Sequence, residues 1–205
     1  MQEQPISQRA LAAMMAHPRN KNRQMTKGHP TATHQRLQKA ENQVRAMASH
    51  SYSQARQALL RPGFFETRTW KNQKDRADRV GAHPDILLFE KRFVSAMKAI
   101  GIPMFAHCVM RTNEEQQRLY NKGVSKALPG LSPHQHGLAV DIIHSTLAWN
   151  LPKPPGDTSA KKCWELIGVM GKEVAQANSI DIEWGGDWKF WDPAHWQIRN
   201  WQDFA

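Results

Sequence analysis

The chain has 205 residues, 40% of them hydrophobic, and a formal net charge of +10 at pH 7. This length allows one folded domain with an appendage, and no run approaches the roughly 20 apolar residues that a membrane-spanning helix needs. The two cysteines, Cys108 and Cys163, exclude a disulfide framework, and two buried thiols without a disulfide are the simpler expectation.

The positive charge is concentrated near the N-terminus. Residues 1–80 contain 15 Lys and Arg but 5 Asp and Glu, whereas residues 81–205 contain equal numbers of each kind. A region with this charge is attracted to polyanions such as teichoic acid, lipopolysaccharide, anionic lipid or nucleic acid. Docking to such a polyanion is therefore one interpretation, and a solvated basic tail is the other.

The same N-terminal part lacks the composition of a folded domain. Residues 1–35 are polar and basic with few large apolar side chains, which predicts an extended arm. Apolar residues then recur at helical spacing from Thr33 to about Leu60, and Pro62 ends this expected helix. We therefore divide the chain into a basic arm with a helix, residues 1–79, and a compact domain, residues 80–205.

Helices and short strands follow one another irregularly within the compact domain. The expected helices cover residues 84–100, 112–123 and 158–177, and the expected strands lie within residues 102–110, 138–143 and 180–200. This mixture predicts an α+β fold, in which a small mixed domain has a central antiparallel sheet flanked by helices. The basic extended arm and its helix precede this domain.

The first cluster of chemically active residues is SPHQHGLAVD, residues 132–141. It contains His134 and Asp141, and both imidazole and carboxylate are good zinc ligands. Positions seven apart on a straight strand face opposite sides, so both reach one ion only if the chain bends, as Gly137 allows. The alternative is a loop histidine and a strand-end aspartate without a metal.

The second cluster combines EWGGDW at residues 183–188 with DPAHW at residues 192–196. Asp192 lies three residues before His195, so a carboxylate would stand beside a metal held by that histidine and act as general base. The alternative is that Asp192 caps a helix beginning at Pro193. Five of the eight tryptophans lie between residues 184 and 201, where they form either core or the wall of a cleft.

Both clusters resemble motifs of one zinc peptidase family. SPHQHGLAVD fits the pattern S-x-H-x-x-G-x-A-x-D, EWGGDW with DPAHW is similar to the closing motif, and RTNEEQ at residues 111–116 resembles the upstream arginine motif. The family contains D-alanyl-D-alanine carboxypeptidases, vancomycin-resistance D,D-peptidases and phage L-alanyl-D-glutamate endopeptidases. The resemblance covers about residues 80–200, with the three motifs in the family's order.

The resemblance implies zinc held by His134, Asp141 and His195, with a fourth position left for water. His136 competes with His134 as a ligand, because it also lies near the bend. The chain departs from the family at Ala194, where relatives often have proline, which concerns the geometry of the loop rather than the ligands.

The resemblance also implies roles around the metal. Asp192 would be the catalytic base, with Glu183 as a competing base for which we favour a structural role. Arg111 would stabilise charge on the substrate carbonyl or carboxylate. Ser132 would hold the peptide, and Trp196 is expected to contact it as well.

The implied function is a zinc-dependent peptidase that cuts the peptide stem of bacterial peptidoglycan, as an L-alanyl-D-glutamate endopeptidase of phage type acting in lysis or from the virion. A D-alanyl-D-alanine carboxypeptidase is the alternative. A non-catalytic zinc-binding virion module and a nucleic-acid-binding protein are rivals from other classes. Glu3 and a brief apolar patch do not form a secretory signal, so the expected location is the host cytoplasm until lysis, or the virion.

Overall fold

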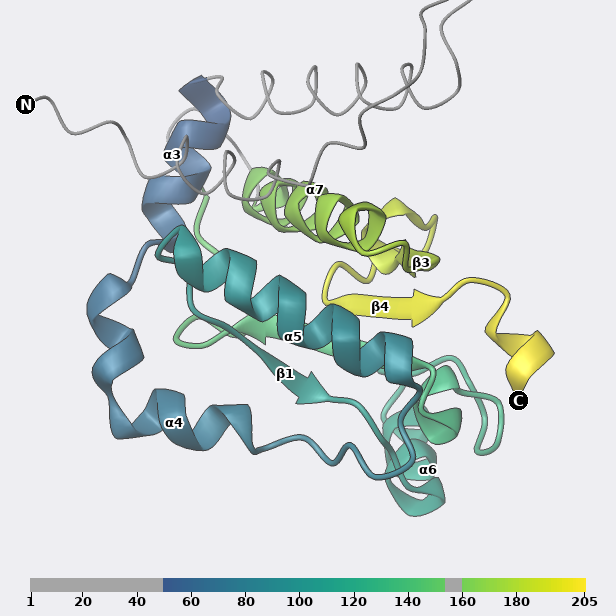
Figure 1. Ribbon diagram of the computed structural model, residues 1–205. Coiled ribbons are helices and arrows are strands. Elements are labelled where there is room, and N and C mark those ends of the chain that lie inside the picture. Colours follow the sequence, from purple (N-terminus) through teal and green to yellow (C-terminus); the bar gives the residue numbers. More distant parts are fainter. Residues whose placement is uncertain (1–49, 154–159) are drawn as a thin grey trace, which may run out of the picture.

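A four-stranded antiparallel sheet forms the centre of the computed structural model, which describes residues 50–153 and 160–205 (Figure 1). The strands are β1 (Met104–Cys108), β2 (Ala139–His144), β3 (Ile182–Trp184) and β4 (His195–Ile198). Their order across the sheet is β1-β2-β4-β3, and every neighbouring pair is antiparallel. Helices flank this sheet, which confirms the expected α+β fold.

The expected helices lie close to their predicted positions, and a further helix at residues 68–74 was not expected. The α-helices are α3 (His50–Leu59), α4 (Arg68–Lys74), α5 (Pro84–Ala99), α6 (Asn113–Asn121) and α7 (Lys161–Ala177). Short 3-10 helices are η1 (Pro62–Glu66), η2 (Pro133–His136), η3 (Gly185–Asp187) and η4 (Trp201–Phe204). The hydroxyl of Thr112 accepts a hydrogen bond from the amide of Glu115, so it caps α6. No helix of the described residues is both long and apolar enough to cross a membrane.

The sheet has a core face and an opposite face. On the core face, Phe89 of α5 packs against Trp196 of β4, and Gly171 of α7 lies so close that a Cβ atom there would meet the Trp196 ring at 2.2 Å. Side chains alternate along a strand, so the neighbours of Trp196 on β4, His195 and Gln197, point to the opposite face. The helices α5 and α7 thus leave that face available for a site.

The described part of the N-terminal region packs onto the same core. Leu59 of α3 and Trp70 of α4 are buried in one cluster with the helices and strands that follow. The Nε2 nitrogen of His144, at the end of β2, donates a hydrogen bond to the carbonyl oxygen of Leu59 at 2.9 Å. The extended arm and most of the helix expected before residue 60 lie outside the described residues, and the separate role of residues 1–79 remains a prediction.

Candidate metal centre and active site

The pairing of β2 with β4 brings two of the expected ligands together. Asp141 of β2 lies directly opposite His195 of β4, and Asp141 Oδ1 is 3.1 Å from His195 Nδ1. His134, from the 3-10 helix η2, completes the group, since its Nε2 lies 3.2 Å from Asp141 Oδ1 and 3.2 Å from His195 Nδ1. Three atoms from three separate elements therefore converge on one point.

The spacing of these three atoms suits a zinc ion. Tetrahedral ligands at roughly 2.0–2.1 Å from zinc stand about 3.3–3.4 Å apart, close to the separations of 3.1–3.2 Å found here. The far nitrogens of both rings are bonded elsewhere, His134 Nδ1 to the carbonyl oxygen of Val109 and His195 Nε2 to Gln197 Oε1, each at 3.0 Å. In its neutral form each ring thus turns a lone pair toward the shared point, so the donor set fits zinc.

The electrostatics of the cluster also favour a cation. Burial opposes a charge on His134, but the Asp141 carboxylate outweighs burial and raises the pKa of His134 to about 10. Burial likewise opposes a charge on Asp141, but the two histidines hold the pKa of Asp141 well below its usual value. The metal-free cluster therefore holds a proton at neutral pH, and a metal that binds there must displace it.

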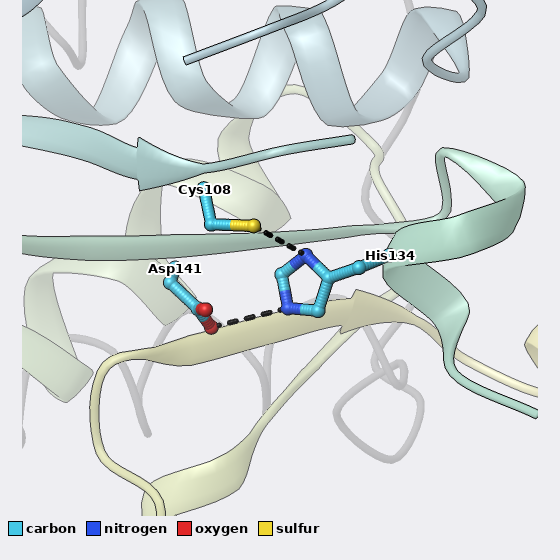
Figure 2. Close-up of side chains that lie close together, drawn as sticks. All are labelled: Cys108, His134 and Asp141. Carbon is cyan, nitrogen blue, oxygen red and sulfur yellow. Dashed lines mark hydrogen bonds and ion pairs between the residues drawn. The ribbon is translucent and has the colours of Figure 1, made fainter. Parts of the chain in front are cut away.

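Cys108 lies at the edge of the cluster rather than inside it. Figure 2 shows its sulfur on the Nδ1 side of the His134 ring, whereas Asp141 approaches the Nε2 side. The Sγ atom is 3.7 Å from His134 Nδ1, the nitrogen that is already bonded to Val109. One imidazole cannot direct both nitrogens at one ion, so we favour His195 over Cys108 as the third ligand. Neither Cys108 nor Cys163 forms a disulfide.

Arg111 stands beside the cluster with its guanidinium largely buried. Its Nη2 donates to Asp141 Oδ2 at 3.2 Å, and its Nη1 donates to Gln116 Oε1 at 3.0 Å. Gln116 is itself fully buried, so the guanidinium has a fixed position. The expected cation is therefore present next to the site, where it pairs with a ligand carboxylate in this structure.

The surroundings of the Asp192 carboxyl group suit a group that exchanges protons. Burial and the nearby Asp141 carboxylate raise the pKa of Asp192, although His195 and His134 act in the opposite direction. Among the described residues, none donates a hydrogen bond to its carboxyl group, so the group is available to a water or a substrate. A strand rather than a helix follows Asp192, so the alternative that it caps a helix is wrong.

Ser132 and Trp196, the other residues expected to contact substrate, lie in different parts of the fold. Ser132 is buried directly before η2, two residues before His134 in the sequence. Trp196 is fully buried and stacks on Trp184 on the core face. The prediction that Trp196 contacts substrate is therefore wrong, because adjacent residues of a strand face opposite sides. Trp188 packs on the His195 ring instead, with centroids 5.2 Å apart.

The two competing residues lie away from the point where the ligands converge. His136 Nε2 is bonded to the carbonyl oxygen of Gly130, and its ring stacks on Trp201. Glu183 accepts a hydrogen bond from Gln197, on the far side of His195 from the cluster. Sequence reasoning missed Gln197, although it stands two residues after His195 on a strand and therefore shares its face.

Gly137 makes the bend that connects His134 to β2. Its φ is +70°, and a Cβ atom there would lie 2.7 Å from both Ala82 Cα and the carbonyl oxygen of Gly81.

We expect Gly137→Ala to lower the free energy of unfolding by roughly 2–4 kcal/mol, from left-handed strain plus overpacking. Gly123→Ala is the matched control, because Gly123 has the same φ with nothing within 4 Å. Urea unfolding measures both, and equal losses would contradict the role of the close contact.

Known proteins are similar to this chain in sequence. A family model described as D-alanyl-D-alanine carboxypeptidase matches residues 126–198. The peptidoglycan L-alanyl-D-glutamate endopeptidase CwlK of Bacillus subtilis (strain 168) is 30% identical over 125 residues, which cover 53% of this chain and 70% of that protein.

Two solved structures are also similar. The L-Ala D-Glu endopeptidase ChiX of Serratia marcescens has a TM-score of 0.47 and 24% identity, over 67% of this chain and 91% of that chain. A Zn(II) complex of a mutant vancomycin resistance D,D-pentapeptidase VanY, from a VanB-type cassette, has a TM-score of 0.37 and 18% identity, over 59% and 74% of the two chains. With TM-scores below 0.5, these structures add nothing to the sequence match.

Proposed function

Because this chain belongs to the family of zinc D-alanyl-D-alanine carboxypeptidases and L-alanyl-D-glutamate endopeptidases, which are peptidoglycan peptidases, we propose that it cleaves the L-alanyl-D-glutamate bond of the peptidoglycan stem. The observation that carries the proposal is the convergence of His134, Asp141 and His195 on one point. These three residues would hold the zinc. The endopeptidase named above supports the choice of bond.

In the proposed reaction, zinc held by His134, Asp141 and His195 would supply a Lewis acid at the scissile carbonyl and would lower the pKa of the attacking water toward roughly 7. The carboxylate of Asp192 takes the proton of that water and then gives it to the nitrogen of the leaving amine. Its raised pKa suits a group that must both accept and release a proton. Arg111 supplies positive charge to the carbonyl oxygen as negative charge develops there.

Arg111 has to divide its hydrogen bonds to do this. Its Nη1 donates to Gln116, which anchors one end of the guanidinium. Its Nη2 donates to Asp141, which places the other end at the cluster. An anchored donor needs little reorganisation when charge develops on the substrate. Ser132, buried at the start of η2, would help to hold the peptide.

Removal of a terminal D-alanine is the second candidate. It is supported by the description of the family model that matches residues 126–198. Both reactions hydrolyse an amide bond with the same proposed residues, so the cluster itself does not distinguish them. The difference lies in which part of the stem peptide enters the site.

Digestion of purified sacculi by the full chain tests the proposal. We expect mass spectrometry to find stem fragments with a new N-terminal D-glutamate, and glycan that retains L-alanine. A zinc chelator should abolish this release, and added zinc should restore it. Release of D-alanine alone would replace the proposal with the carboxypeptidase, and no release in the presence of zinc would refute both.

A phage source and action in lysis or from the virion are part of the proposal, supported by the EWGGDW form of the closing motif. Residues 1–79 would bind a polyanion or a virion protein through their positive charge. The structure describes only residues 50–79 of this region, where α3 and α4 pack on the core. The polyanion partner is therefore supported by charge alone.

A further inference from the structure

His195 has a feature that the proposed reaction does not use, namely the partner of its second ring nitrogen. Its Nδ1 faces the cluster, whereas its Nε2 is 3.0 Å from Gln197 Oε1. An amide oxygen only accepts hydrogen bonds, so Nε2 must carry the proton in this pair. Nδ1 is then unprotonated in the neutral ring, which is the form that a metal requires.

The orientation of the Gln197 amide decides this tautomer. If the amide were turned over, its NH2 group would face His195 Nε2, and the proton would move to Nδ1. That tautomer would point an N–H at Asp141 Oδ1 in place of a lone pair. The direction of one side-chain amide therefore determines whether His195 offers a ligand atom.

Glu183 fixes the direction of that amide. Gln197 Nε2 donates to Glu183 Oε1 at 2.7 Å. In the reverse orientation the amide oxygen of Gln197 would face Glu183, and a carboxylate has no hydrogen to donate to it. The two residues are directly opposite one another on β3 and β4.

We propose that Gln197 and Glu183 are positioning residues, which hold His195 in the tautomer that turns its Nδ1 lone pair toward the zinc. The Glu183 carboxylate orients the Gln197 amide, and the Gln197 amide in turn fixes the tautomer of the His195 ring. This inference rests on the proposed ligand set. Gln197 is nearly buried at 8% exposure, so water does not readily take its place.

Gln197→Met tests the proposal, because methionine keeps the length of the side chain and removes the acceptor. We expect the affinity of the full chain for zinc, measured by competition with a chromophoric chelator, to fall about 10–100-fold. The double exchange Gln197→Glu with Glu183→Gln should remain within about threefold of the wild type, since position 197 still accepts from His195 Nε2 and the amide placed at position 183 can donate to position 197. Gln73→Met is the matched control for the same change elsewhere, because Gln73 bonds to the carbonyl oxygen of Ser145.

Wild-type zinc affinity in Gln197→Met would overturn the proposal, as would a loss in the double exchange equal to that of the single variant. A second measurement does not depend on the folding of any variant. In the zinc-loaded wild type, 15N NMR should show His195 protonated at Nε2, and protonation at Nδ1 would overturn the proposal. A protein that passes these tests but releases nothing from sacculi would refute the proposed function alone.

Discussion

Replacing Asp192 by Asn is expected to leave zinc bound and to reduce hydrolysis of sacculi about 10²–10⁴-fold, the range typical of a lost general acid or base. Asn has nearly the same shape as Asp, so the turn into β4 should persist. The Asp192 amide donates to the carbonyl oxygen of Gly185, and the Asp192 carbonyl oxygen accepts from the amide of His195, so neither bond involves the side chain. The loss should therefore appear in turnover rather than in folding or in metal content.

The measurement is the rate of fragment release together with zinc per protein by elemental analysis. Asp181→Asn is a suitable control, because Asp181 is an exposed carboxylate that pairs with Arg199. Near-normal turnover in Asp192→Asn would remove Asp192 from the proposed reaction. Loss of zinc in that variant would instead make Asp192 part of the metal site.

Much of the fold and the approach of His134 to Asp141 were predictable because their signals are local. Pro84 and Thr112 mark the starts of α5 and α6, and both helices begin where these residues indicate. His134 and Asp141 lie in one ten-residue motif, so a single bend at Gly137 suffices to bring them together. The third proposed ligand, His195, came from the resemblance, because only strand pairing places it opposite Asp141.

The surroundings of the ligands depend on contacts between distant segments. Cys108 approaches His134 because β1 pairs with β2 across an irregular register, which no local pattern reveals. Glu183 reaches Gln197 only through the pairing of β3 with β4. Trp196 was a different error, because a strand at residues 195–198 places it on the face opposite His195. Period-two alternation alone would have corrected that prediction.

His195→Ala is expected to remove the metal itself. Apparent zinc binding of roughly 10–16 kcal/mol, divided among three or four ligands, gives about 4 kcal/mol for each, or about 10³-fold in affinity. Loss of zinc should abolish hydrolysis as well. Chelator competition and elemental analysis measure the metal directly, so a folded but inactive variant with full zinc occupancy would contradict the assignment.

Two control variants decide between the ligand sets. His136→Ala should keep the zinc affinity, because the His136 ring bonds to Gly130 and stacks on Trp201 away from the cluster. Cys108→Ala should also keep it, since the sulfur approaches the nitrogen of His134 that is bonded to Val109. If Cys108→Ala lost zinc while His195→Ala retained it, the metal would lie among Cys108, His134 and Asp141. The His134 ring would then have to turn and give up its bond to Val109, and the tautomer of His195 would no longer bear on the metal.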